Sequence, residues 1–256
     1  MIDPQAIADV LIEAERTRTS VPPITRRNPF LDVETAYKAQ ALVVEHHLRN
    51  GERVIGAKLA FTSAIKRHAM GIHEPAYGRL TSGMVVPFGE PVRCDALIAP
   101  RAEPEIAFVI GRRLAGGTTV TEVLRATEAV LPAIEIVDTR YASSFRLADA
   151  IADNTGAARI ALGTRARRPA ELADLSVLGC VFRSRKGLET AAGGAAMGHP
   201  AAAVAWLANA MDARGDALDE GAIVLSGGLT AAVPLRPGGV VMAEFDGLGS
   251  IAVRCE

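Results

Sequence analysis

The first 50 residues carry apolar side chains at helical spacing in two separate stretches. One stretch follows Asp3 and Pro4 and continues to Ala14, and the other runs from Asp32 to Gly51. Aspartate is a favourable N-cap, proline is accepted in the first helical turn, and glycine often follows a helix end. The pattern therefore predicts two helices joined by a short loop.

Beyond residue 53 the pattern changes to short apolar runs separated by turn residues, which is typical of buried strands. The first run spans 54–61, after which Thr62 and Ser63 offer a cap for a short helix ending at Met70. Further strands are expected at 105–111, 132–138, 158–162, 176–183, 222–227, 239–245 and 249–254, and helices at about 121–130 and 200–213. Glycine-rich turns between the last strands predict an antiparallel meander.

The order of these elements favours an α+β fold over an alternating doubly wound sheet, because strands dominate and the helices are segregated. The sequence shows no repeat, linker or low-complexity segment. We therefore expect an N-terminal helical segment at residues 1–52 and one catalytic domain at residues 53–256.

Composition narrows the class of protein. The chain has 256 residues, 49% of them hydrophobic and 22% charged, with a net charge of −1, which is typical of a globular protein with its own core. This charge gives no reason to expect nucleic acid or an anionic membrane as a partner. The N-terminus lacks the pattern of a signal peptide, and the longest uncharged run, 190–211, contains too many small residues and helix breakers for a membrane span.

The three cysteines, Cys94, Cys180 and Cys255, lie far apart and form neither a CxxC motif nor an even-numbered framework. This spacing suits a reducing cytoplasm and argues against a structural zinc site. Cys180 lies in an apolar run and is expected to be an inert core residue. We expect a cytoplasmic protein.

Three glutamates in apolar surroundings are the first candidates for chemistry. Glu103 and Glu105 flank Pro104 at an expected strand start or edge, and alternate residues of a strand project from one face. Glu135 lies in the apolar run 131–137, where an unpaired carboxylate is costly. A solvated Glu103–Glu105 pair, and a Glu135 that points outward or pairs with an arginine, remain alternatives. If the three converge, their oxygens suit Mg²⁺ or Mn²⁺ rather than zinc and leave positions for a 2-oxo acid.

A lysine is the second candidate. Only four of the 28 basic residues are lysines, and Lys58 lies in the middle of the apolar run 54–61. Burial lowers the pKa of a lysine and makes it useful as a general acid or base. The alternative is a lysine that extends its ammonium group from the strand end into solvent.

Other polar motifs are less specific. The segment 153–156 predicts either a capped turn or a pocket wall, and His199 before Pro200 predicts a helix start rather than a catalytic histidine. The sequence contains neither an HExxH zinc motif nor a G-x-S-x-G motif. The glycines at 247–249 lack the pattern of a dinucleotide site.

Taken in order, several segments resemble the 2-keto-4-pentenoate hydratase / 2-oxo-3-hexenedioate (4-oxalocrotonate) decarboxylase family of the fumarylacetoacetase-like superfamily. The matching segments are 56–63 (GAKLAFTS), 74–78 (EPAYG), 101–109 (RAEPEIAFV), 132–140 (PAIEIVDTR), 152–154 (ADN), 198–200 (GHP) and 247–250 (GLGS). They occur in the family's order from about residue 30 to the end of the chain. The resemblance implies a fumarylacetoacetase-like mixed β-roll with peripheral helices.

The resemblance also implies roles for individual residues. Glu103, Glu105 and Glu135 become ligands of Mg²⁺, with Mn²⁺ as the alternative, and Lys58 becomes the catalytic lysine. The implied substrate-binding residues are Thr62, Ser63, Tyr77, Gly78, Asp153, Asn154 and Thr230. The implied partners are a small 2-oxo dicarboxylic acid, further copies of the chain in a homo-oligomer, and a hydratase of the same pathway.

Within this family the sequence favours a decarboxylase. Hydratases of the family typically carry aspartate where this chain has Ala76, and alanine cannot activate water. Segments 138–141 (DTRY) and 227–234 (GGLTAAVP) look like the decarboxylase versions. We therefore expect metal-dependent decarboxylation of 2-oxo-3-hexenedioate to 2-hydroxypenta-2,4-dienoate in the meta-cleavage pathway of aromatic degradation. The alternatives are hydration of 2-hydroxypenta-2,4-dienoate to 4-hydroxy-2-oxopentanoate, and a non-catalytic subunit that supports such a hydratase.

Two departures from the family pattern concern the substrate. Arg79 occupies a position where an apolar residue is usual, so we expect it either to bind a distal carboxylate or to mark a different substrate tail. The family's Asp-Asn-Ala-Ser segment is Asp-Asn-Thr-Gly here, at 153–156, which moves the hydroxyl group by one position.

Overall fold

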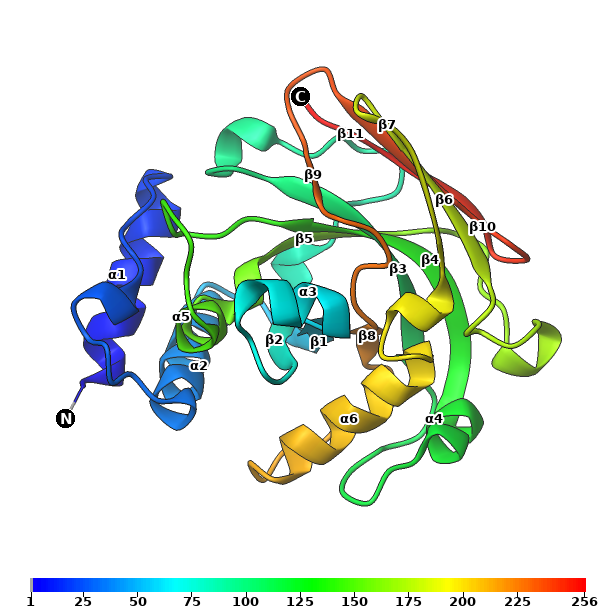
Figure 1. The fold of residues 1–256 in the computed structure, drawn as a ribbon, viewed down its shortest axis with the longest axis horizontal. Helices are drawn as coiled ribbons and strands as arrows, with labels where there is room; N and C mark the ends of the chain where they lie inside the picture. Colours follow the sequence, from blue (N-terminus) through cyan, green and yellow to red (C-terminus); the bar gives the residue numbers. More distant parts are fainter. Residues whose placement is uncertain (1) are drawn as a thin grey trace.

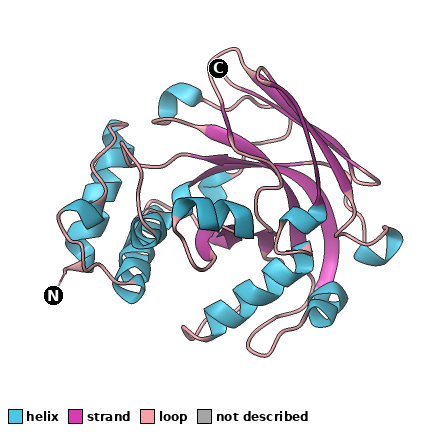
Figure 2. Ribbon diagram, viewed as in Figure 1, coloured by secondary structure: helices cyan, strands magenta, loops and turns pink. Residues whose placement is uncertain are grey.

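The computed structural model describes residues 2–256 as two β-sheets with helices packed around them (Figures 1 and 2). The helices are α1 (Pro4–Thr17), α2 (Val33–Arg49), α3 (Ala64–Met70), α4 (Val120–Ala126), α5 (Leu147–Ala152) and α6 (Pro200–Asp212). The strands are β1 (Val54–Ala60), β2 (Ala76–Thr81), β3 (Arg101–Ile110), β4 (Thr127–Val137), β5 (Ala157–Leu162), β6 (Gly179–Ser184), β7 (Gly187–Ala192), β8 (Ile223–Leu225), β9 (Val233–Pro234), β10 (Val240–Phe245) and β11 (Gly249–Arg254). Across the described residues, every helix is too short or too polar to cross a bilayer.

The larger sheet curls strongly. Its strand order is β2-β1-β8-β3-β4-β5, with β9 pairing to β3, and its ladders are antiparallel except for β1–β8. The two ends of the sheet meet, because Val85 bridges to Ile160 and the amide of Val86 donates to the Ile160 carbonyl at 2.8 Å. Leu80 from β2 and Ile160 from β5 pack in one cluster with Ala107 of β3. These side chains therefore line the inside of the curl.

The outer face of this sheet carries the main core. Ile106 and Phe108 of β3, which alternate with the inward residues, pack with Phe182 and Phe245 of the second sheet and with Leu207 of α6. The second sheet has the order β11-β10-β6-β7, and Figure 1 shows it beside β3 and β4. The expected α+β class is confirmed.

The two N-terminal helices begin where the sequence predicts. The side chain of Asp3 accepts a hydrogen bond from the Gln5 amide, and that of Asp32 accepts one from the Thr35 amide. Both helices share an apolar cluster with α5 and with Ala76 of β2. The division at residues 52 and 53 stays a prediction.

Three expectations about secondary structure are wrong. The helix expected at 121–130 ends at Ala126, because the chain from Thr127 onward pairs with β3 and begins the long strand β4. Only the last hairpin of the expected C-terminal meander forms: β10 and β11 pair antiparallel in the second sheet, while β8 inserts between β1 and β3 of the first. Strands β2, β7 and the two-residue β9 were not expected, and β7 alternates between exposed and half-buried residues with little apolar pattern.

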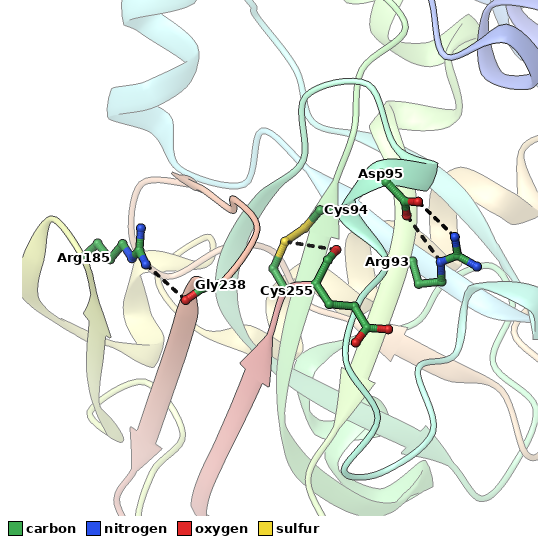
Figure 3. Close-up of a disulfide and its surroundings, with 7 residues drawn as sticks. Arg93, Cys94, Asp95, Arg185, Gly238 and Cys255 are labelled. Carbon is green, nitrogen blue, oxygen red and sulfur yellow. Dashed lines mark hydrogen bonds and ion pairs between the residues drawn. A yellow bond between two sulfur atoms is a disulfide. The ribbon is translucent and has the colours of Figure 1, made fainter.

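A disulfide joins Cys94 to Cys255, across a sequence separation of 161, with the two Cα atoms 5.8 Å apart (Figure 3). This pairing corrects the expectation that the cysteines form no framework. The amide of Cys94 donates to the carbonyl of Glu256, so backbone hydrogen bonding holds the same segments together. Cys180 is free and buried, and burial raises the pKa of its thiol to about 12, as expected of an inert core residue.

Candidate metal centre and active site

Three carboxylates meet on the inner face of the curled sheet. Glu103 and Glu105 project from the same face of β3, and Glu135 of β4 lies directly opposite Glu103 in the antiparallel register. One oxygen from each side chain lies within 4.8 Å of the others. Within residues 2–256 this is the single group of three or more His, Cys, Asp or Glu side chains found at such spacing. The expected convergence is therefore present.

Pro104, between two of these glutamates, lies inside β3 rather than at the expected strand start or edge. On one side β3 pairs with β4 along its length, whereas on the other side β8 and β9 leave a gap around Pro104. The loop after β8 fills this gap, and the amide of Leu229 donates to the Pro104 carbonyl at 3.0 Å. Proline is accepted here because no neighbouring strand requires its missing N–H.

The buried carboxylates are only partly paired. Glu105 and Glu135 are fully buried; Oε1 of Glu105 and Oε2 of Glu135 have no hydrogen-bond partner among the described residues, and Oε1 of Glu135 has Nζ of Lys58 as its charged neighbour. Burial, followed by repulsion from Glu135 and Glu103, raises the pKa of Glu105 well above its usual 4.5. A divalent cation is the natural counter-charge for such a cluster, and three carboxylate oxygens suit Mg²⁺ or Mn²⁺. The residues present fit a metal site.

Lys58 of β1 stands beside this cluster. Its Nζ lies 3.1 Å from Oε1 of Glu135 and donates to the carbonyl of Thr155 at 3.2 Å. Burial alone lowers the pKa of Lys58, but the three glutamates outweigh burial and raise it above the usual 10.5. The expected lowering of the pKa is therefore wrong. The solvent-directed alternative is also wrong, because the side chain is 2% exposed.

The register of β1 and β2 decides which neighbours face the cluster. Lys58 pairs with Gly78, so the side chains of Tyr77 and Arg79 project from the opposite face. Tyr77 stacks on a tyrosine of α2, and Arg79 forms an ion pair with Asp216. The structure thus brings Gly78 beside Lys58 but directs the side chains of Tyr77 and Arg79 away from the carboxylates.

The turn after α5 uses its polar side chains within the protein. Both carboxylate oxygens of Asp153 accept hydrogen bonds, from Thr139 and from Arg140. The side chain of Asn154 makes two hydrogen bonds to the backbone of Arg79. Its Oδ1 accepts from the Arg79 N–H at 2.7 Å, and its Nδ2 donates to the Arg79 carbonyl at 2.9 Å. The substrate-binding roles expected of Asp153 and Asn154 stay predictions.

The backbone of Gly227 and Gly228 packs directly against the carboxylates. The amide of Gly227 donates to Oε2 of Glu105 at 2.6 Å. A Cβ atom at Gly227 would overlap the side chain of Thr62, and one at Gly228 would overlap the Glu103 carboxylate. This contact was not expected from the sequence, although the paired glycines at the end of an apolar run are a signal for close backbone approach.

The remaining predicted positions lie around this region. Thr230 is buried and its hydroxyl donates to the carbonyl of Ala231, while Ser63 is half-buried directly before α3. The substrate-binding roles expected of Thr230 and Ser63 stay predictions. His199 accepts a hydrogen bond from the Ala201 amide at 2.9 Å and caps α6, as predicted for a helix start.

The sequence of this chain matches a known protein family and several of its relatives. The sequence pattern of the fumarylacetoacetate (FAA) hydrolase C-terminal family matches residues 45–256. A 4-oxalocrotonate decarboxylase of Pseudomonas sp. (strain CF600) is 36% identical over 252 residues, covering 97% of this chain and 95% of that protein. A 2-keto-4-pentenoate hydratase of Paraburkholderia xenovorans (strain LB400) is 34% identical over 252 residues, covering 97% and 93%.

A solved structure agrees with these relatives. The 4-oxalocrotonate decarboxylase from Pseudomonas putida G7, complexed with magnesium and adipate, has a TM-score of 0.94 and 33% identity to this chain. The match covers 99% of this chain and 97% of that one. The fold is thus the β-roll that the sequence resemblance implied, and the chain belongs to the fumarylacetoacetate (FAA) hydrolase C-terminal family.

Proposed function

We propose that this chain is a metal-dependent decarboxylase that converts 2-oxo-3-hexenedioate (4-oxalocrotonate) to 2-hydroxypenta-2,4-dienoate. The observation that carries the proposal is the buried cluster of Glu103, Glu105 and Glu135 with Lys58 beside it. The decarboxylase from P. putida G7, which shares the fold over the whole chain, is complexed with magnesium and adipate. Adipate is a linear dicarboxylate with the same number of carbon atoms as the proposed substrate.

The three glutamates would hold the metal ion. When bound, Mg²⁺ supplies Lewis-acid stabilisation of negative charge at the 2-oxo acid end of the substrate. Loss of CO₂ from the distal end breaks the C5–C6 bond, and the electron pair moves through the C3–C4 double bond towards the 2-oxo oxygen. The charge that the site must stabilise therefore develops far from the bond that breaks.

Lys58 supplies a second positive charge at the cluster. Its Nζ lies beside a carboxylate oxygen of Glu135 and the carbonyl of Thr155, which are both acceptors, so the geometry orients Lys58 as a hydrogen-bond donor. An ammonium in this position stabilises developing negative charge and delivers a proton to the dienolate. Of the proposed substrate-binding residues, Thr62 lies against Gly227, whose amide binds Glu105, which supports a position beside the carboxylate cluster.

The second candidate is hydration of 2-hydroxypenta-2,4-dienoate, because relatives named hydratases are nearly as similar as the decarboxylases. The same metal site would serve this reaction. Ala76 favours decarboxylation, since it offers no side-chain base. The test incubates the metal-stripped protein with 2-oxo-3-hexenedioate, with and without Mg²⁺, while CO₂ is measured. Mg²⁺-dependent CO₂ is expected. Its absence, together with water addition to 2-hydroxypenta-2,4-dienoate, would establish the hydratase instead.

We further propose a homo-oligomer that associates with a hydratase of the same pathway and acts in the cytoplasm. The similarity to relatives named as decarboxylase and as hydratase supports the link to a hydratase. The Cys94–Cys255 disulfide weighs against the cytoplasm, where such bonds are rare. Thiol labelling of the protein inside cells decides this point, because a cytoplasmic chain should keep Cys94 and Cys255 reduced.

A further inference from the structure

The turn that follows α5 has an unusual backbone. Asn154, Thr155 and Gly156 adopt φ values of 48°, 52° and 69°, which is a left-handed turn. Glycine accepts this region freely, but a β-branched residue such as threonine rarely enters it. Strained backbone of this kind persists only where the surroundings impose it, and it concentrates at functional sites.

The strained conformation directs one backbone group at Lys58. The carbonyl of Thr155 accepts a hydrogen bond from Nζ of Lys58 at 3.2 Å, while Glu135 lies on another side of the ammonium at 3.1 Å. A lysine ammonium sits on a flexible stem and has three donors, so two fixed partners are needed to define its position. The turn thus supplies one of the two partners of the Lys58 ammonium, the uncharged Thr155 carbonyl, and Glu135 supplies the charged one.

Arg140 holds the first end of the turn directly, and the segment that carries Arg140 holds the other end. Its side chain is 3% exposed, and it forms an ion pair with Asp153 through Nε. Its Nη2 donates to the Asp153 carbonyl at 2.6 Å, and its Nη1 donates to the Asp138 carbonyl at 3.1 Å. The far end of the turn is tied to the same segment, because the Asp138 amide donates to the Gly156 carbonyl at 2.8 Å. A planar guanidinium can make these divergent bonds at once, whereas an ammonium cannot.

We propose that Arg140 is a positioning residue for Lys58, acting with Asp153 to hold the left-handed turn that presents the Thr155 carbonyl. The inference rests on the proposed function in one respect, which is that Lys58 is the catalytic lysine. The hydrogen bonds of the Arg140 side chain and amide go to Asp153 and to the Asp138 carbonyl, so its effect on Lys58 passes through the backbone of the turn.

The test compares two double variants. Arg140→Gln/Asp153→Asn removes the buried pair without leaving either charge unpaired. Arg113→Gln/Asp219→Asn makes the same chemical change in an exposed pair and serves as the matched control. We expect the first variant to bind Mg²⁺ as the wild type does, because the glutamates lie on β3 and β4. Its kcat should fall roughly 10- to 100-fold, as is common when a supporting hydrogen bond to a functional group is lost.

A spectroscopic readout follows Lys58 directly. The chain has four lysines, so ¹⁵N-lysine labelling gives few side-chain signals, and only a buried, hydrogen-bonded ammonium exchanges slowly with water. Lys58→Met assigns the signal. We expect it to shift or to exchange faster in the Arg140→Gln/Asp153→Asn variant and to be unchanged in the control.

Two results would overturn the proposal. One is an unchanged Lys58 signal and kcat in the buried-pair variant; the other is a loss of Mg²⁺ affinity that parallels the loss of activity. If that variant fails to fold, Arg140→Lys replaces it, because an ammonium keeps the positive charge beside Asp153 but cannot make the divergent bonds of the guanidinium. Arg140→Lys with unchanged kcat and Lys58 signal would also refute the idea. If the wild type shows no turnover, the proposed function fails, while the Lys58 signal still decides whether Arg140 positions the lysine.

Discussion

Glu103 and Glu135 are direct cross-strand neighbours, one on β3 and one on β4, on the inner face of the curled sheet. Like charges at such a pair destabilise a sheet, and here Glu105 adds a third carboxylate within 4.8 Å. The arrangement opposes folding of the metal-free chain and favours binding of a cation. The metal site and the stability of the sheet are therefore coupled.

This coupling predicts opposite effects of one substitution. Glu103→Gln should leave the metal-free protein as stable as the wild type or more so, because repulsion with Glu135 is relieved. The same change should weaken Mg²⁺ binding by at least about tenfold, since one charged ligand is lost. Thermal unfolding and calorimetric titration measure the two effects. Glu128→Gln, an exposed change on β4, is the control, and equal Mg²⁺ affinity in both variants would contradict the site.

Removal of the lysine charge separates catalysis from metal binding. Lys58→Met should lower kcat by about 10²- to 10⁴-fold, the usual contribution of a positioned acid or base. Mg²⁺ affinity should be kept or increased, because a positive charge 3.1 Å from Glu135 disappears. Rates of CO₂ release and calorimetry test this, with the exposed Lys186→Met as the control. Full activity of Lys58→Met with metal bound would remove Lys58 from the mechanism.

The disulfide predicts a stability that depends on redox state. Because Cys94 and Cys255 close a long loop, their bond should add up to about 5 kcal/mol to the free energy of unfolding. Chemical denaturation with and without a thiol reductant measures the difference. The reductant should have no effect on a Cys94→Ser/Cys255→Ser variant. A wild type that is equally stable under both conditions would show that the bond contributes nothing.

The attachment of α1 to α2 should depend on pH. His47 lies 3.6 Å from Glu15 and 3.3 Å from Glu52. The neighbouring carboxylate of Glu15, together with that of Glu52, raises the pKa of His47 above 6.5, so its stabilisation is complete below that pH and is lost as the pH rises through the higher value. Burial alone would raise the pKa of Glu15, but His47 and two nearby arginines lower it to about 2. That stabilisation is present above pH 4.5 and is lost as the pH falls towards 2.

The shifted pKa values of Glu15 and His47 define the pH range in which their interaction stabilises the protein most. The difference in Tm between wild type and His47→Gln should be largest between pH 4.5 and 6.5 and should shrink as the solution becomes alkaline. His73→Gln, an exposed change, should show no such trend. A constant difference in Tm across this range would mean that His47 acts through packing rather than charge.

The sequence by itself determined features that depend on neighbours along the chain. The caps at Asp3, Asp32 and His199 followed from residue type and spacing, because a capping side chain reaches only the next few amides. The common face of Glu103 and Glu105 followed from the two-residue period of a strand. The family resemblance then added Glu135 and Lys58 to the same site.

Only the tertiary structure decided what depends on pairing between distant segments. The register of β3 and β4 places Glu135 opposite Glu103, and the register of β1 and β2 turns Arg79 away from the site. Three glutamates from other strands reverse the effect of burial on the pKa of Lys58, which no local pattern near that lysine indicates. The Cys94–Cys255 bond and the Arg140 contacts likewise join residues far apart in the chain or on opposite sides of a turn. Local spacing fixes which face a side chain occupies, but the charge and the contacts that it meets there come from strands that only folding brings together.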